Sequence, residues 1–238
     1  MTEVITVAGV LCILLLVGGL VGLIDWRNFK PRWLLIATVM VLLNDALLTN
    51  LYGLLPDLLP SLQWNWQGKL LALAATLMLA RSPCLGWANA GLAVKQAAGS
   101  LRTALPVAVV YCVFFVALAF AFPSGSASHE TIAFQLSMPG LEEEAFYRGL
   151  LLAALDRAYR GRVRFLGIDW GWGAPLSCVM FGLAHAFGYS DGAFAFEPMV
   201  MLLTTIPAIL AVWLRYRTGS LLLPVVLHNA GNSASFLV

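Results

Sequence analysis

The sequence predicts an all-α, polytopic membrane protein, in which a bundle of about eight transmembrane helices encloses a polar cavity. Of its 238 residues, 61% are hydrophobic and only 11% are charged, whereas a soluble domain carries about 25% charged residues. Apolar runs of span length recur along the whole chain, and basic residues gather in every second loop. Because lipid offers no partner for a free backbone N–H or C=O, helices are the expected spanning elements.

Eight apolar runs approach the length of a membrane span, which is roughly 20 residues. In chain order they cover 4–24, 33–55, 66–81, 104–122, 138–156, 172–188, 196–214 and 219–237. The third run is the shortest, and no soluble insertion or repeat interrupts the series. We therefore treat 1–238 as a single membrane domain, in which 1–122 forms the N-terminal helices.

The loops predict the orientation, because basic residues near span ends favour the cytoplasm. The loops and helix ends after the first, third, fifth and seventh spans hold Arg27, Lys30, Arg32, Arg81, Lys95, Arg102, Arg157, Arg160, Arg162, Arg164, Arg215 and Arg217. The alternate loops, 56–65, 123–137 and 189–195, hold no Lys or Arg. This alternation supports eight crossings and predicts an integral protein of a prokaryotic inner or plasma membrane with both termini extracytoplasmic. The net charge of +2 is too small and too dispersed for a nucleic-acid partner.

Three polar clusters interrupt the predicted helices at membrane depth. An ionisable group there costs about 2.5–3.5 kcal/mol on insertion scales and usually marks function. The clusters are Glu142, Glu143, Glu144 and Arg148 in the fifth span, Phe181 and His185 in the sixth, and His228 and Asn232 in the eighth. Two of the three histidines of the chain therefore lie in these clusters.

Helical spacing predicts the direction in which each glutamate side chain points. Glu144 and Arg148 are four residues apart, so they lie on one helix face and can form an ion pair. Glu143 is rotated by about 100° from Glu144 and can face a cavity instead. We interpret Glu142 as an interfacial residue.

The other two clusters repeat the spacing of four. His228 and Asn232 can present two polar groups to one point, and Phe181 can form an aromatic wall beside His185. Packing roles remain open: a membrane histidine can be a hydrogen-bonding residue of the bundle, and Asn232 can hydrogen-bond between helices. Asn44 and Asp45 in the second span are a further polar spot, and the sequence does not decide between a structural and a cavity-lining role.

At these residues the sequence resembles the CPBP family of intramembrane proteases, also called the Abi or type II CAAX endopeptidase family. That family carries the motifs E-E-x-x-x-R, F-x-x-x-H and H-x-x-x-N in this order. Here they are Glu143-Glu144-x-x-x-Arg148, Phe181-x-x-x-His185 and His228-x-x-x-Asn232. The resemblance covers 137–236, the CPBP-like catalytic helices, whereas the earlier spans match only in being hydrophobic.

The resemblance implies a CAAX-type intramembrane protease, which hydrolyses a peptide bond near the membrane-associated tail of a protein or peptide. Glu143, with His185, would position and deprotonate the attacking water, which needs a base within hydrogen-bond reach. His228 and Asn232 would hydrogen-bond the oxyanion of the tetrahedral intermediate. The expected partners are therefore a membrane-anchored substrate and the lipid bilayer.

The resemblance also implies three supporting residues, and zinc remains as an alternative cofactor. Glu144 and Arg148 would hold the helix and Glu143 in place, with Phe181 beside the imidazole. Glu143, His185 and His228 are also the donor types of a two-His-one-carboxylate zinc site. Because H-E-x-x-H is absent and Asn is an uncommon zinc ligand, the glutamic mechanism without a cofactor is favoured, and zinc is the alternative.

Two functions of other classes stay open. A proton-coupled transporter would use Glu143, His185 and His228 as a relay, although no inverted repeat is evident. A non-catalytic membrane binding or immunity protein would tolerate loss of the Glu143 carboxylate. The serine motif Gly-x-Ser-Gly, an aspartyl G-x-G-D site and a site-2 zinc motif are absent, which disfavours other classes of intramembrane protease.

The predicted orientation also gives the depth of the site. The fifth span would run inward from Glu143, the sixth outward to His185, and the eighth outward through His228 to Asn232. These four residues would then meet in the outer half of the bilayer.

Overall fold

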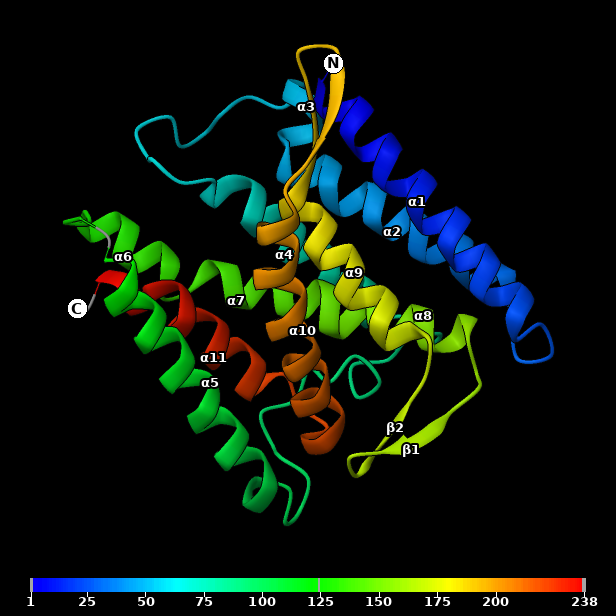
Figure 1. Ribbon diagram of the computed structural model, residues 1–238. Coiled ribbons are helices and arrows are strands. Elements are labelled where there is room, and N and C mark those ends of the chain that lie inside the picture. The colour runs from blue at the N-terminus through cyan, green and yellow to red at the C-terminus, as the bar shows by residue number, and fades with distance from the viewer. Residues whose placement is uncertain (1, 124, 237–238) are drawn as a thin grey trace.

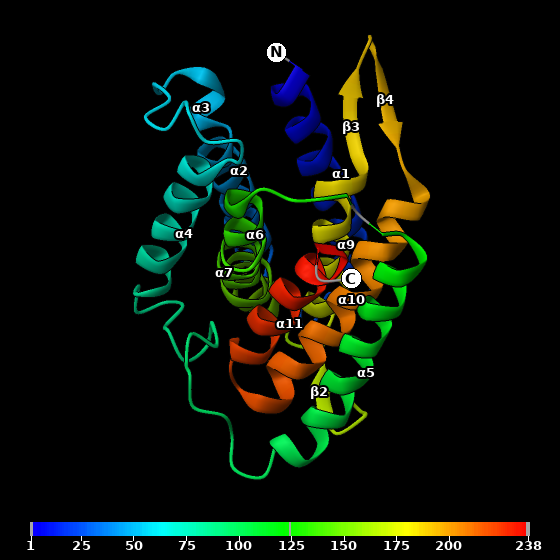
Figure 2. The ribbon, with the colours of Figure 1, turned by 90° about the vertical axis from the view of Figure 1, so that its left-hand side faces the viewer.

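The computed structural model describes residues 2–123 and 125–236, and most of them are helical (Figures 1 and 2). The helices are α1 (Thr2–Ile24), α2 (Pro31–Leu48), α3 (Asn50–Gly53), α4 (Trp66–Ala80), α5 (Leu101–Ala121), α6 (His129–Gln135), α7 (Met138–Glu143), the π-helix η1 (Glu144–Leu151), α8 (Leu152–Ala158), α9 (Gly173–Ala186), α10 (Pro198–Thr218), α11 (Leu222–Ser233) and the 3₁₀ helix η2 (Ala234–Phe236). Two antiparallel hairpins join helices: β1 (Val163–Phe165) with β2 (Ile168–Trp170), and β3 (Phe187–Ser190) with β4 (Ala193–Phe196).

The prediction of an all-α membrane bundle is confirmed. Four helices, α1, α2, α5 and α10, are long and apolar enough to cross a membrane, and α4 and α9 are shorter apolar helices. The fifth predicted span is the continuous run α7–η1–α8, and the eighth overlaps α11. The chain is thus an integral membrane protein, while the number of eight crossings stays a prediction.

Several predicted boundaries differ from the observed ones. The second predicted span continues to residue 55, but α2 ends at Leu48, where Thr49 donates its hydroxyl to the Asp45 carbonyl oxygen at 2.9 Å. The next residues, Asn50, Leu51 and Tyr52, have positive φ angles and turn the chain away. Helix α11, which overlaps the eighth predicted span, ends at Ser233. That span was predicted to end at position 237, which lies outside the described residues.

The fifth predicted span is the central helix of the bundle. Helix α8 packs against α2 and α9, while α7 packs against α4 and α11 (Figure 2). The side chains of Leu151, Leu155 and Tyr159 are completely buried in the main apolar core. Large apolar side chains on the outer faces, such as Leu16 of α1 and Val110 of α5, are exposed instead. This outer apolar surface suits lipid as the surrounding solvent.

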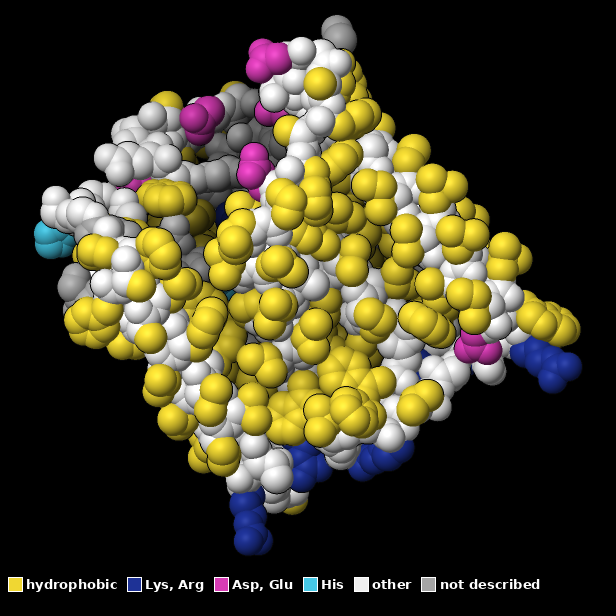
Figure 3. Space-filling view, viewed as in Figure 1, with side chains coloured by type: hydrophobic (Ala, Val, Ile, Leu, Met, Phe, Trp, Pro, Cys, Tyr) yellow, Lys and Arg dark blue, Asp and Glu magenta, His cyan; other side chains and the backbone are white. Residues whose placement is uncertain are grey.

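Charged side chains separate towards opposite ends of the molecule. Lys and Arg gather at the lower edge in Figure 3, whereas most visible Asp and Glu lie at the upper end. The lower end holds β1–β2 and the C-terminal end of α10, and the upper end holds α3 and β3–β4 (Figure 1). The loops that the sequence groups by charge are therefore also grouped in space.

Candidate active site

The central helix changes its winding at the first motif. Helix α7 begins after Ser137 with Pro139 in its first turn, a position that tolerates the missing N–H. From Glu144 to Leu151 the chain is a π-helix, a rare form that occurs frequently at functional sites. Its π-helical winding alters the directions of the side chains that follow Glu143.

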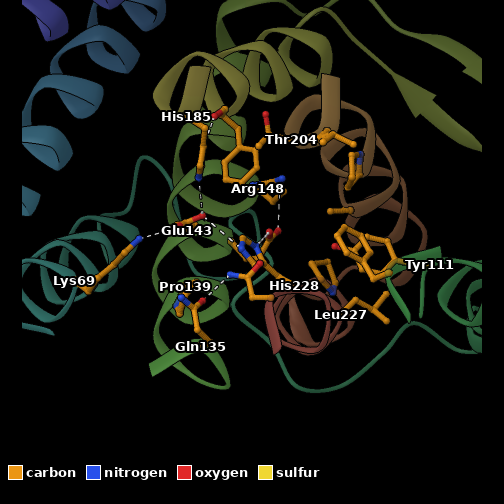
Figure 4. A pocket seen from close by; sticks show the side chains of 18 of the residues that line it. Lys69, Tyr111, Gln135, Pro139, Glu143, Arg148, His185, Thr204, Leu227 and His228 are labelled. Atoms are coloured by element: carbon orange, nitrogen blue, oxygen red, sulfur yellow. Dashed lines mark hydrogen bonds and ion pairs between the residues drawn. The ribbon is translucent and has the colours of Figure 1, made fainter. Parts of the chain in front are cut away.

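All seven predicted site residues line one cavity of about 520 Å³. They are Glu143, Glu144 and Arg148 of α7 and η1, Phe181 and His185 of α9, and His228 and Asn232 of α11. Helices α5 and α10 form another wall with apolar residues such as Phe115 and Leu214. The three sequence motifs, which are far apart in the chain, thus meet at one polar spot inside an apolar bundle (Figure 4).

Glu143 lies at the centre of this spot. Its Oε2 atom is 3.5 Å from Nε2 of His228 and 3.8 Å from Nε2 of His185. Within the described part of the chain, this buried oxygen accepts no hydrogen bond from a protein group. Its lone pairs are therefore available to a molecule in the cavity.

Hydrogen bonds on the other ring nitrogen orient both imidazoles. Nδ1 of His185 lies 2.8 Å from the Phe181 carbonyl oxygen, and Nδ1 of His228 lies 2.7 Å from Oε1 of Glu144. Because a carbonyl or carboxylate oxygen only accepts, we assign the proton to Nδ1 in each ring. In the neutral rings both Nε2 atoms then direct a lone pair towards Glu143, and protonation converts them into donors.

The support predicted for Glu144, Arg148 and Phe181 has a physical basis in their contacts. Arg148 Nε lies 3.3 Å from Glu144 Oε2, and both side chains are almost fully buried, at 2% and 1% exposed. The Arg148 guanidinium also lies 3.9 Å from the centre of the Phe181 ring. That ring lies 4.6 Å from the His185 ring, so one packed group links the ion pair to the imidazole.

Asn232 reaches the cavity but has a different partner from the one expected. Its Nδ2 donates to Oε1 of Gln135 at 3.2 Å, across the gap between α11 and α6. The sequence reasoning did not single out Gln135, which lines the same cavity. The Asn232 amide carries two N–H donors, so one remains for a substrate oxygen while the other is bonded to Gln135.

The interpretation of Glu142 as an interfacial residue is wrong. Its side chain is fully buried, and its Oε2 atom lies 2.7 Å from Nζ of Lys69. The same ammonium group lies 2.6 Å from Oε1 of Glu143. Sequence reasoning missed Lys69, although a single charge in the otherwise apolar helix Trp66–Ala80 is a recognised signal of function.

Three other polar residues, Asn229, Asp45 and Asn44, lie outside the lining of this cavity. Asn229 of α11 accepts a hydrogen bond from the Gly140 backbone N–H at 2.7 Å and so ties α11 to α7. Asp45 accepts a hydrogen bond from the Tyr52 hydroxyl at 3.0 Å. Asn44 and Asp45 line a separate, smaller cavity and are not among the residues that line the candidate active site.

The cavity contains carboxylate and imidazole side chains, which are common metal ligands. In residues 2–123 and 125–236, no group of three or more His, Cys, Asp or Glu side chains is arranged to hold a metal ion. What the arrangement provides is a buried carboxylate oxygen facing two oriented imidazoles. This set can accept a proton from water, and the imidazoles can donate once they are protonated.

Comparison with known proteins gives a family match. A family model described as type II CAAX prenyl endopeptidase Rce1-like matches residues 129–234. The match contains all three motifs and covers less than half of the chain, leaving α1 to α5 outside it. Searches of curated proteins and of solved structures found no match. Residues 129–234 therefore match the Rce1-like family of type II CAAX endopeptidases, in agreement with the resemblance of the three motifs.

Proposed function

We propose that this protein is an intramembrane endopeptidase that hydrolyses a peptide bond near the membrane-associated tail of a protein or peptide. The family match over residues 129–234 supports the class, a CAAX-type peptide hydrolase. The observation that carries the proposal is the position of Glu143, whose free oxygen faces the Nε2 atoms of His185 and His228 in one cavity. The partners are a membrane-anchored substrate and the bilayer around it.

In the proposed reaction, Glu143 is the general base. A water molecule between its Oε2 and His185 loses one proton to the carboxylate, and the hydroxide oxygen bonds to the carbonyl carbon of the substrate. The carbonyl π electrons move to oxygen and give a tetrahedral oxyanion. Glu143 then returns the proton to the leaving nitrogen as the C–N bond breaks.

Two residues of α11 are proposed to stabilise the oxyanion. Because Nδ1 of His228 is directed at Glu144, its Nε2 donates only when the ring is an imidazolium. The amide of Asn232 supplies a second donor through the N–H that is not bonded to Gln135. Each such donor is worth about 2.7–4 kcal/mol in the transition state.

The glutamic mechanism is proposed ahead of a zinc mechanism. One oxygen of Glu143 already lies against the Lys69 ammonium group, and a second cation on the same carboxylate would be repelled by it. A zinc ion would instead use Glu143, His185 and His228, and it would supply a Lewis acid and an activated water. The order of preference rests on this charge argument.

The test is a comparison of the wild type with Glu143→Gln, purified in detergent and returned to liposomes with a tail-anchored peptide library. We expect the variant to insert and accumulate normally but to lose cleavage, because the amide keeps the shape and cannot accept the proton. Near-normal turnover by the variant would refute the assignment. Elemental analysis of the same preparations tests the metal: one zinc per chain, lost in His185→Ala, would favour the zinc mechanism.

A further inference from the structure

Two basic residues lie away from the basic end of the molecule. Twelve of the 14 Lys and Arg residues belong to the loops and helix ends that the sequence groups together. The remaining two are Lys69 and Arg148, and each contacts glutamates of the central helix. Arg148 is part of the first motif, whereas Lys69 is on α4, outside the residues that the family model matches.

The ammonium group of Lys69 contacts two carboxylates, one fully buried and one that lines the cavity. Its Nζ lies 2.7 Å from Glu142 Oε2 and 2.6 Å from Glu143 Oε1 (Figure 4 shows the contact with Glu143). Glu142 is fully buried and is not among the residues lining the cavity, so it cannot touch a substrate there. It can, however, hold the ammonium group of Lys69 in place through this ion pair.

The contact with Lys69 determines which oxygen of Glu143 faces the cavity centre. With Oε1 held by the ammonium group, Oε2 faces His185 and His228. With all five charged groups ionised, Glu142, Glu143, Glu144, Lys69 and Arg148 together carry one formal negative charge. Without Lys69, three carboxylates would share one guanidinium in a buried site, and their repulsion would be weakly screened.

The first turn of α4 is fixed firmly enough to position Lys69. The Asn65 side chain accepts a hydrogen bond from the Gly68 N–H at 2.9 Å and donates to the Leu48 carbonyl oxygen at 2.7 Å. Gly68 is buried so closely against the end of α2 that a Cβ atom would collide with Leu48. The start of α4 is therefore clamped to α2, one residue before Lys69.

We infer that Lys69 is a positioning residue for the catalytic carboxylate, and that Glu142 holds it in place. This inference rests on the proposed function, since it deepens the role of Glu143 as the general base. It gives the N-terminal helices a direct part in the reaction, because the residue that orients Glu143 comes from α4. A misplacement of a reacting group by about 1 Å can cost roughly 10²-fold in rate.

The kinetic test uses Lys69→Met, Lys69→Arg and Glu142→Gln, with the exposed Lys95→Met as a matched control. We expect Lys69→Met to lower kcat about 10²-fold with KM changed less than about two-fold, because Lys69 acts on the base and not on substrate binding. Lys69→Arg should retain most of kcat, Glu142→Gln should lie between them, and Lys95→Met should match the wild type. Unchanged kcat in well-folded Lys69→Met, or a change confined to KM, would overturn the inference.

A second kinetic measurement distinguishes positioning from general support of the fold. Ethylammonium should restore part of kcat to Lys69→Ala in a concentration-dependent way, because it supplies an N–H donor and a positive charge at the vacated place. Tetramethylammonium, which has no N–H, should not. Equal effects of the two ions, or none from either, together with a loss of activity that follows the amount of folded protein, would indicate a merely structural role.

A stability cycle tests the contact without any activity. Thermal unfolding in detergent is measured for wild type, Lys69→Met, Glu143→Gln and the double variant. We expect the midpoint shifts of the single variants not to add, because removing one partner leaves the other charge unpaired. Additive shifts would overturn the inference. Normal cleavage by Glu143→Gln would instead refute the proposed function. The stability measurements would still show whether Lys69 and Glu143 interact.

Discussion

Three consecutive glutamates of the central helix have three different environments. Glu142 is fully buried against Lys69, Glu143 directs a free oxygen at two imidazoles, and Glu144 joins Arg148 to His228. The residue type is the same in each case, so the difference lies in the partner. Of the three, Glu143 is the one whose oxygen lies within 4 Å of the Nε2 atoms of both His185 and His228.

The Glu144–Arg148 pair gives the first prediction at this scale. Arg148→Ala should destabilise the protein by about 3–5 kcal/mol, because it leaves a carboxylate buried without its guanidinium. Activity should fall as well, since Glu144 orients the ring of His228. Thermal unfolding in detergent and cleavage by the same preparation measure the two effects.

The control for this prediction is an exposed pair of the same kind. Arg164 and Asp169 lie 2.9 Å apart on the β1–β2 hairpin with most of each side chain in solvent. Arg164→Ala should therefore cost about 1 kcal/mol or less. The double variant Glu144→Gln, Arg148→Met should be more stable than Arg148→Ala alone. Equal stability of Arg148→Ala and the wild type would contradict the assigned burial of the pair.

At the residue scale, the sequence predicts the members of the site better than their partners. Polar residues within apolar runs, their spacing of four and the family motifs selected the seven cavity residues, because that spacing decides which side chains share a helix face. The contacts of Glu142 with Lys69 and of Asn232 with Gln135 join residues far apart in the chain. No local periodicity contains such pairs, so they follow only from the packing of α4, α6, α7 and α11.

At the scale of elements, the α-helical period describes the central helix incompletely. The predicted span 138–156 is helical and continues to Ala158, but its middle is a π-helix. Residue propensities do not distinguish these windings, and packing on all sides selects between them. The hairpins were also missed, although Asp191-Gly192, with φ angles of 52° and 82°, is a strong local signal for a hairpin turn.

The contact between α7 and α11 is the element-scale feature that brings the motifs together. Gly140 of α7 lies against α11, where a Cβ atom would be 2.5 Å from Asn229 Oδ1 and 2.6 Å from the Val225 carbonyl oxygen. Backbone and side chain therefore approach closely because residue 140 has no side chain. His228 is carried by the same part of α11, one residue from Asn229.

Gly140→Ala should therefore separate α7 from α11 and weaken the contacts of His228 with Glu143 and Glu144. We expect kcat to fall about 10²-fold, as for other displacements near 1 Å, with normal insertion into the membrane. Gly19→Ala on α1 is the control, because a Cβ atom there meets nothing within 4 Å. Full activity of Gly140→Ala would show that the helices tolerate a wider spacing.

At the scale of the whole molecule, the site lies away from the basic end. Glu143 is at the end of α7, and His185 is in the last turn of α9, which continues into β3. Hairpin β3–β4 and helix α3 are at the upper end in Figure 1, opposite β1–β2. The sequence predicts this separation because charge alternation is a property of the loops and does not depend on helix packing. The direction in which the molecule sits in the membrane follows from the positive-inside tendency alone.

The last prediction concerns that direction. If the basic loops are cytoplasmic, the cavity opens in the outer half of the bilayer, and a substrate presented from the extracytoplasmic side reaches Glu143 most directly. In a background without the four cysteines, single cysteines at Ser126 and Ser190 should then react with an impermeant thiol reagent in intact cells. A cysteine at Val163, which is 70% exposed on β1, should not react until the membranes are opened. Because all three positions are exposed, labelling in opened membranes serves as the control for accessibility. The reverse pattern would place the cavity towards the cytoplasm and make cytoplasmic tails the first substrates to test.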